Sequence, residues 1–333
     1  MIITRTPYRI SLFGGGSDHP AWFRENGGEV ISFSIDKYCY LNTRILPPFF
    51  SHKYRVSYSI VELCNSLSEI KHPVVREVIR TFAPTLQLEI HHHGDLPARS
   101  GIGSSSAFTV GLIHALLELQ SRKPNKVELA DLAIQMEHEI LKENVGWQDQ
   151  VACSIGGFNH LIFSKDNSWT SKKIDVSNSY LNKLEQRLFL VYTGLSRSSS
   201  DITLGLLKNL SQKKSQMLRV VEMVSTSLEI LNSESDLDMI GELLHESWLL
   251  KRSLNAFSSN SELDDFYDKA LCAGALGGKL LGAGGGGFFL FWLREDSTEN
   301  FRSKFRLGTH VPVKVSFEGS QIVHNSALEK GGH

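Results

Sequence analysis

The sequence predicts an α+β protein of two domains. A chain of 333 residues suggests about two hydrophobic cores, each large enough to be stable. Its first part combines strand patterns with two amphipathic helices, and its second part has long helical patterns followed by two strands. This order favours an α+β sandwich. We place the boundary after a polar stretch, so that residues 1–184 form the first domain and residues 185–333 the second.

Hydrophobic periodicity locates the expected elements. Alternation of apolar and polar residues, as at Leu86, Leu88 and Ile90, indicates a strand, and recurrence every three to four residues indicates a helix. The predicted strands lie at residues 2–10, 29–45, 54–60, 86–91, 158–163, 188–194, 288–293 and 311–317. The predicted helices lie at residues 18–26, 104–120, 126–142, 201–231, 236–256 and 263–275.

The composition is that of a globular protein without a general attraction to polyanions. Lys and Arg number 35 and Asp and Glu 36, so with a net charge of −1 neither nucleic acid nor an anionic membrane is an expected partner. No apolar run approaches the roughly 18 residues of a membrane span, and the N-terminus lacks a signal-peptide core. The four cysteines form no C-x-x-C pair, so we expect free, buried thiols in a reducing cytoplasm.

A loop rich in glycine and serine joins a predicted strand to a predicted helix. Gly101 and Gly103 allow a ligand to approach the backbone closely, and the first turn of the helix offers unpaired N–H groups and the positive end of a dipole. These features together bind phosphate. The hydroxyls of Ser104, Ser105 and Ser106 can add hydrogen bonds to phosphate or a ligand to Mg²⁺. The alternative is an ordinary loop with a serine cap.

Three motifs in this chain resemble, in the correct order, those of the GHMP kinases, a family of sugar and small-molecule kinases. They begin at Thr6, Pro97 and Lys279, and the second reads Pro-Ala-Arg-Ser-Gly-Ile-Gly-Ser-Ser-Ser-Ala. The resemblance implies a two-domain GHMP kinase fold of the α+β class, with ATP and the acceptor bound in the cleft between the domains. The residues it assigns to ATP binding are Pro97, Arg99, Ser100, Gly101, Ile102, Gly103, Ser104, Ser105 and Ser106.

By the same resemblance, Asp149 occupies the position of the catalytic aspartate. It lies beyond a predicted helix end, close to a glycine, where a carboxylate can point into a cleft and accept a proton. A surface or capping aspartate is the alternative. Arg9 matches a basic residue that lies near this carboxylate in relatives. Its guanidinium would stabilise charge on the transferring phosphoryl group and lower the pKa of Asp149, whereas Arg5 on the same strand is expected to be a surface charge.

A carboxylate for Mg²⁺ is expected twelve residues before Asp149. The spacing in family members matches Glu137, at the border of the buried face of the helix predicted over 126–142. Ser105 would supply the hydroxyl ligand, with Ser104 next in line. The alternatives are His138 or Glu139, if the register differs by one residue, and a solvated glutamate without a metal. We expect ATP and Mg²⁺ as the cofactors.

The resemblance also assigns residues to the acceptor. Asp18, with Gly15 and Gly16 before it, matches the aspartate that binds acceptor hydroxyls in sugar kinases, since a carboxylate suits a vicinal diol. A phosphorylated acceptor needs a second anion site, for which Arg197 and Lys279 are the favoured basic residues. The third glycine loop, with Gly284 and Gly285, would brace the phosphate loop or line the acceptor pocket; a tight entry to a strand is the alternative.

Three local patterns resemble the D-glycero-α-D-manno-heptose 7-phosphate kinases of this family. They are Gly-Gly-Gly-Ser-Asp ending at Asp18, the third motif, and the segment from His245 to Arg252. The resemblance implies an ATP-dependent kinase that phosphorylates the anomeric hydroxyl of the heptose 7-phosphate and gives the 1,7-bisphosphate. The alternatives are a kinase for fucose, galactose or another sugar, a non-catalytic regulator that binds sugar and ATP, and a decarboxylase of the same superfamily. The expected partners are these small molecules, with the chain a monomer or homodimer.

Overall fold

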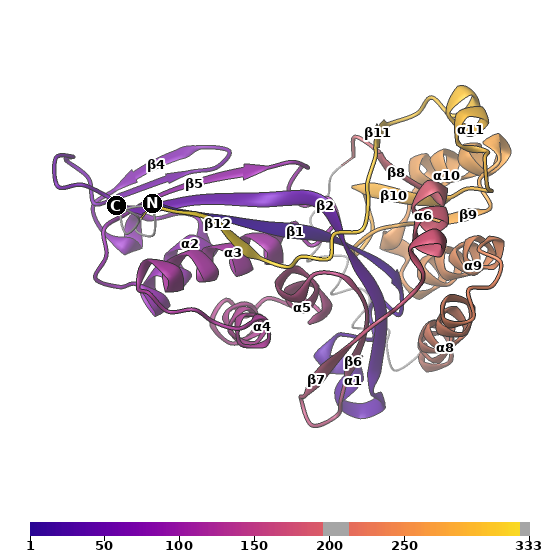
Figure 1. Cartoon of the computed structure of the whole chain (residues 1–333), viewed down its shortest axis with the longest axis horizontal. Coiled ribbons are helices and arrows are strands. Elements are labelled where there is room, and N and C mark those ends of the chain that lie inside the picture. The colour runs from indigo at the N-terminus through magenta and orange to yellow at the C-terminus, as the bar shows by residue number, and fades with distance from the viewer. Residues whose placement is uncertain (196–212, 327–333) are drawn as a thin grey trace.

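The computed structural model describes residues 1–195 and 213–326, which form two lobes, each built on a sheet (Figure 1). The first sheet contains β1 (Ile2–Phe13), β2 (Gly28–Ile45), β3 (Tyr54–Ser57), β4 (Val61–Cys64), β5 (Leu88–Gly94), β6 (Phe158–Phe163), β7 (Trp169–Lys173) and β12 (Gln321–Asn325). The second sheet has the order β11-β8-β10-β9, formed by β8 (Leu188–Tyr192), β9 (Gly277–Leu280), β10 (Phe288–Trp292) and β11 (Thr309–Val311).

Helices cover both sheets. In the first lobe they are α1 (Pro20–Asn26), α2 (Pro73–Phe82), α3 (Ser104–Leu119), α4 (Lys126–Gln135) and α5 (Gln148–Ile155). In the second lobe they are α6 (Asn178–Arg187), α8 (Lys214–Asn232), α9 (Asp238–Leu254), α10 (Ser261–Ala273) and α11 (Thr298–Lys304). Figure 1 shows α2, α3, α4 and α5 on one face of the first sheet and α8, α9 and α10 gathered beside the second. The mixed α+β class predicted from the sequence is therefore confirmed.

Strand β2 organises the first sheet. It pairs with β1 on one edge, and on the other edge its first half, Gly28–Phe33, pairs with β6 while its second half, Cys39–Ile45, pairs with β5. The other edge of β1 pairs with β12, in the register Ile2 to Asn325. The chain therefore returns from the second lobe to complete the first sheet.

Helix α3 holds the glycine-rich loop against this sheet. It is apolar on nearly every side and almost wholly buried, as expected for a helix inside a core. At its middle, Gly111 packs so closely on β1 that an added Cβ would lie 2.9 Å from the Thr6 hydroxyl oxygen and 3.2 Å from a methyl group of Leu41. The first turn of α3 is thereby fixed relative to β1.

Most predicted elements are confirmed within a few residues, and three differ in instructive ways. The strand predicted at 54–60 ends at Ser57, where the chain turns into β4, a strand that the sequence did not predict and that pairs with β3 as a hairpin. The helix predicted over 126–142 ends at Gln135 and continues as a π-helical turn, Met136–Ile140. The strand predicted at 311–317 ends at Val311, because Pro312 has no N–H for the ladder. Of the helix predicted over 201–231, residues 201–212 lie outside the described residues.

The sequence did not predict α2, α5, α6, α11, β7, β9 or β12. The domain boundary at residue 184 stays a prediction; α6 spans this position and the second sheet begins at Leu188. All four cysteines are free, and Cys272 is exposed where we expected burial. Within the parts of the chain that the structure describes, no helix has the length and apolar content needed to cross a bilayer.

Candidate active site

The glycine-rich loop between β5 and α3 leaves the start of the helix open. Gly103 is the residue before the helix, in the left-handed region with a φ of 74°, and no side chain among the described residues caps the first N–H groups of α3. The loop is ordered by its own serines: Ser100 Oγ donates to the Pro97 carbonyl (2.6 Å), and Ser104 Oγ accepts from the Arg99 N–H (3.1 Å). Unpaired N–H groups at a helix N-terminus can bind an anion.

The third glycine loop, between β9 and β10, presses backbone against backbone on the first. Gly101 has a φ of 84°, and a Cβ added there would lie 2.5 Å from the Leu281 carbonyl oxygen. A Cβ on Gly287 would lie 2.3 Å from the Ser100 carbonyl oxygen. Gly285 faces elsewhere, since its N–H donates to the Ser258 carbonyl (3.0 Å). The two loops therefore brace each other across the lobes, while Gly284 and Gly285 contact the Ser258 segment.

Arg9 and Asp149 form a two-pronged ion pair beside the glycine-rich loop. Nε and Nη2 of Arg9 donate to the two carboxylate oxygens of Asp149 at 2.7 and 2.8 Å, and Nη1 donates to the Gly101 carbonyl at 2.7 Å. A Cβ on Gly103 would lie 3.5 Å from Asp149 Oδ2. Arg5, by contrast, bonds to Gln321 at the far end of β1 (2.6 Å). The guanidinium thus joins the aspartate to the loop.

Asp149 opens α5, a helix where the sequence suggested only a position beyond a helix end. Its side chain is 25% exposed, whereas that of Arg9 is 4% exposed. Burial raises the pKa of the Asp149 carboxyl and the nearby Asp18 adds to this, while Arg9 lowers it. A paired carboxylate with one open side can accept a hydrogen bond from a hydroxyl group.

Asp18 is buried at the same place and holds the first motif against the start of α5. Its Oδ1 accepts from the Gly16 N–H (2.9 Å) and its Oδ2 from the Gln148 N–H (3.2 Å). A Cβ on Gly146 would lie 1.8 Å from Oδ2, so a side chain there would displace the Asp18 carboxylate. Burial raises the pKa of Asp18, although its backbone hydrogen bonds lower it. Gly15 lies in the same motif, and a Cβ added to it would lie 3.2 Å from the Ser11 hydroxyl oxygen.

Glu137 lies in the π-helical turn after α4 and is 1% exposed. Its Oε2 accepts from Ser106 Oγ (3.0 Å) and from the Gln150 amide, and its buried Oε1 has no hydrogen-bond partner within residues 1–195 and 213–326. The nearby Thr109 hydroxyl donates instead to the Ser105 carbonyl (3.2 Å). Burial raises the pKa of Glu137 to about 7. The structure thus places Ser106, and not the exposed Ser105, against this carboxylate.

Of the two basic residues predicted for the second anion site, the structure describes only Lys279. Lys279 is buried on β9, and its amine donates to the Leu12 carbonyl (3.0 Å), which links the two lobes. Burial lowers the pKa of Lys279 to about 8. Arg197, the other predicted anion-binding residue, lies outside the described residues. The sequence missed the contact of Gln150 with Glu137, although its place next to Asp149 was a signal.

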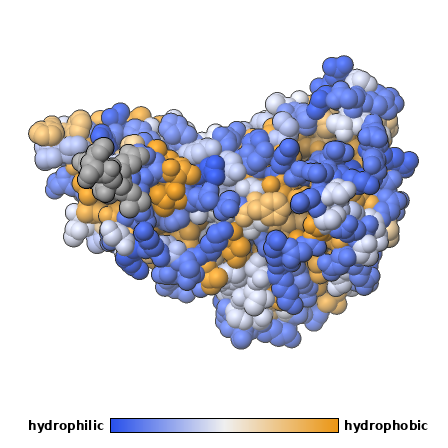
Figure 2. Space-filling view, in the orientation of Figure 1, coloured by the Kyte–Doolittle hydropathy of each residue, from blue (hydrophilic) through white to orange (hydrophobic). Residues whose placement is uncertain are grey.

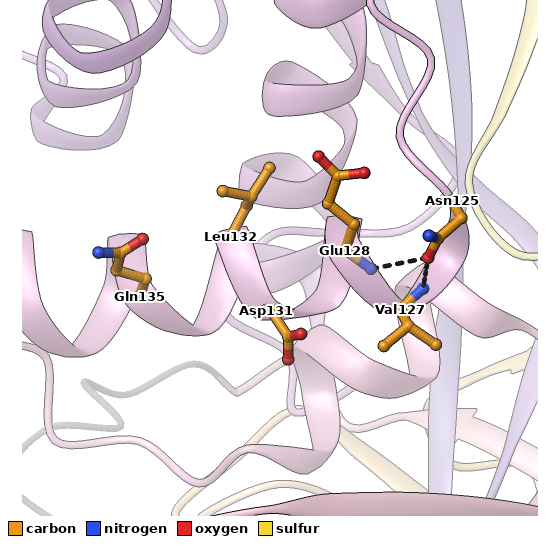
Figure 3. Close-up of a pocket in the computed structure, with 6 residues that line it drawn as sticks. All are labelled: Asn125, Val127, Glu128, Asp131, Leu132 and Gln135. Atoms are coloured by element: carbon orange, nitrogen blue, oxygen red, sulfur yellow. Dashed lines mark hydrogen bonds between the residues drawn. The ribbon is translucent and has the colours of Figure 1, made fainter.

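The surface has a concave region between the lobes and a shallow pocket on α4. Figure 2 shows a concave outline between the two lobes. A separate shallow pocket lies on the exposed side of α4 (Figure 3), lined by Asn125, Val127, Glu128, Asp131, Leu132 and Gln135. None of these six residues belongs to the site described above.

Comparison with known proteins places this arrangement in a family. The model for the GHMP kinases N terminal domain matches residues 70–157, and that for the GHMP kinases C terminal matches residues 228–307, together about half of the chain. The chain belongs to the GHMP kinase family. It is therefore a phosphotransferase with an alcohol group as acceptor.

Relatives of known activity cover nearly all of this GHMP kinase. It is 29% identical to the D-glycero-alpha-D-manno-heptose 7-phosphate kinase of Campylobacter jejuni, over 90% of this chain and 91% of that protein. It is 25% identical to the galactokinase of Thermotoga maritima, over 96% and 99%.

Solved structures show the same fold. The crystal structure of a D-glycero-D-manno-heptose 1-phosphate kinase from Bacteroides thetaiotaomicron has a TM-score of 0.79 at 22% identity, covering 98% of this chain and 100% of that one. The galactokinase of Lactococcus lactis complexed with galactose has a TM-score of 0.73 at 16% identity, covering 97% and 95%. The GHMP kinase fold predicted from the three motifs is thereby confirmed.

Proposed function

We propose that this GHMP kinase transfers the γ-phosphoryl group of ATP to the anomeric hydroxyl of D-glycero-α-D-manno-heptose 7-phosphate, giving the 1,7-bisphosphate. The observation that carries the transfer step is the ion pair of Arg9 and Asp149 directly beside the open N-terminus of α3. It supports a site in which an acceptor hydroxyl faces a bound phosphate. The similarity to the Campylobacter jejuni heptose 7-phosphate kinase supports the choice of sugar.

The donor would bind at the glycine-rich loop. The N–H groups at the start of α3 would hold the β- and γ-phosphates of ATP, since no side chain of the described residues caps them. Arg9 adds a positive charge next to this position, which suits the charge that spreads over the phosphoryl oxygens during transfer. Arg99 and the loop serines complete the proposed ATP site.

The residues around Glu137 fit a magnesium ion. Its Oε1 is a buried carboxylate oxygen with no hydrogen-bond partner in the part of the chain that the structure describes, and a serine hydroxyl lies next to Oε2, so hard oxygen ligands are available in one place. Glu137 would hold Mg²⁺ together with Ser105, as predicted from the family, or with Ser106, as the contact suggests. A bound ion would supply positive charge that offsets the negative charge of the phosphate groups.

The acceptor would bind on the other side of Asp149. Asp149 would accept the hydrogen bond of the attacking hydroxyl and orient it, and in a loose transition state this orientation matters more than early deprotonation. Asp18, Gly15 and Gly16 would contact the other hydroxyl groups of the sugar. Lys279, with Arg197, is proposed for the 7-phosphate.

An ADP-release assay across acceptors tests the proposal. We expect the highest kcat/KM with heptose 7-phosphate, and a product with phosphate on the anomeric carbon by phosphorus NMR. A higher kcat/KM with free galactose or fucose would refute the proposed acceptor and favour a kinase for a free sugar, the second candidate, which the similarity to galactokinases supports. Nucleotide binding without ADP release in the presence of any sugar would favour the non-catalytic regulator.

A further inference from the structure

Helix α9 lies along β9, the strand that leads into the third glycine loop. A Cβ on Gly277 would lie 2.0 Å from the Gly241 carbonyl oxygen and 2.8 Å from the His245 backbone nitrogen, so the backbones of strand and helix are in contact. Trp248, one turn further along α9, is fully buried. The side of α9 that carries His245 and Trp248 therefore fixes β9, and the next turn reaches the loop.

Lys251 is the residue at that point. Its amine donates to the Leu280 carbonyl (2.8 Å) and to the Gly282 carbonyl (2.5 Å), the last residue of β9 and the second residue of the loop. No carboxylate forms an ion pair with Lys251 among the described residues. Burial, together with Lys279 and Arg9, lowers the pKa of Lys251 well below its ordinary value. An amine retains two N–H groups even when deprotonated, and these match the two carbonyls.

The third glycine loop in turn contacts the glycine-rich loop before α3, which is the proposed phosphate loop. A Cβ on Gly282 would lie 2.5 Å from the Gly101 Cα, so the two backbones are in contact. The Gly101 carbonyl in turn accepts from Arg9, which holds Asp149. A continuous path of contacts therefore runs from α9 in the second lobe to the catalytic ion pair in the first.

We propose that Lys251 is a positioning residue for the nucleotide: by fixing the 280–282 backbone from behind, it holds the phosphate loop at Gly101 in the shape that binds the ATP phosphates. This rests on the proposed ATP site at that loop and does not depend on which sugar is the acceptor. Lys251 itself touches neither substrate.

The test replaces Lys251 by Met, which keeps the length of the side chain and removes both N–H groups. We expect the Kd of a non-hydrolysable ATP analogue with Mg²⁺, measured by titration calorimetry without acceptor, to rise between about tenfold and a hundredfold, because a small displacement of a positioning loop costs this much. The KM for the acceptor sugar should stay unchanged. The matched control is Arg252→Met: Arg252 is the next residue on α9, pairs with Asp264 (2.8 Å) and should alter neither constant.

A second variant tests the path. Gly282→Ala places a Cβ against Gly101 and should raise the same Kd. The double variant with Lys251→Met should lose less binding free energy for the nucleotide than the sum of the losses in the two single variants, because both act through one loop. Lys251→Gln, with a shorter amide donor, replaces the Met variant if thermal unfolding shows that the latter does not fold.

An unchanged nucleotide Kd in a folded Lys251 variant would overturn the inference, as would strictly additive effects or a rise confined to the acceptor KM. A wild-type protein that binds no nucleotide would overturn the proposed function as well. A wild-type protein that binds nucleotide but phosphorylates a different sugar would refute only the proposed acceptor, and the Lys251 comparison would still decide this inference.

Discussion

The buried carboxylate of Glu137 makes a strong prediction about stability and pH. Raising its pKa from 4.5 to about 7 corresponds, at about 1.4 kcal/mol for each pKa unit, to about 3 kcal/mol of unfolding free energy. The folded protein binds the proton more tightly than the unfolded chain, so without ligands the stability falls as the pH rises from about 4.5 to about 7. The Gln side chain of Glu137→Gln cannot ionise, so this variant should lose this part of the pH dependence. At pH 8 its unfolding free energy should exceed that of the wild type by up to about 3 kcal/mol.

Urea unfolding at several pH values, followed by tryptophan fluorescence, measures the difference. The control is Glu139→Gln, an exposed residue of the same π-helical turn, which should follow the wild type at every pH. Addition of ATP and Mg²⁺ at 1,000 times the Kd should reverse the order, because such a ligand adds about 4.1 kcal/mol to a protein that binds it and little to one that has lost a metal ligand. Parallel pH curves for wild type and Glu137→Gln would refute the reasoning.

Three further substitutions, two of them with a matched control, probe the site. Asp149→Asn should lower kcat by roughly 10²- to 10⁴-fold with little change in the nucleotide Kd, measured by ADP release and calorimetry; near-normal turnover would remove it from the transfer step. Arg9→Met should move the acid limb of the kcat–pH profile to higher pH, since the guanidinium lowers the pKa of Asp149, and Arg5→Met should not. Gly101→Ala and Gly274→Ala both put a side chain at positive φ and should each cost about 1–2 kcal/mol of stability in urea unfolding. Only Gly101→Ala, whose Cβ meets a carbonyl, should also weaken nucleotide binding, whereas Gly274 faces open space.

The sequence predicted well what is encoded locally. The strand–glycine–helix pattern located the glycine-rich loop between β5 and α3, because a left-handed backbone favours glycine at Gly101 and Gly103 and this leaves a direct trace in the sequence. Arg9 and Asp149 lie in contact where the family resemblance implied they would be near one another. Their catalytic roles stay predictions.

Other contacts depend on geometry that no local pattern records. The pairing of Glu137 with Ser106 arises where α4 passes into a π-helical turn, whose extra residue per turn rotates the side chains away from the register of an α-helix. Helix α5 has eight residues, too few for a clear apolar period, so the sequence placed Asp149 beyond a helix end and not within a helix. Strand β12 is short and partly polar, and only its distant partner β1 makes it a strand.

That partnership bears on how the protein is made. During synthesis the outer edge of β1 has no neighbour until residue 325 has left the ribosome, so the part of the molecule translated first is the part completed last. Until then its open N–H and C=O groups can pair with another nascent chain. We therefore expect ribosome-bound chains that stop short of β12 to depend on chaperones and to aggregate when released, even though Arg9, the glycine-rich loop and Asp149 have already been translated.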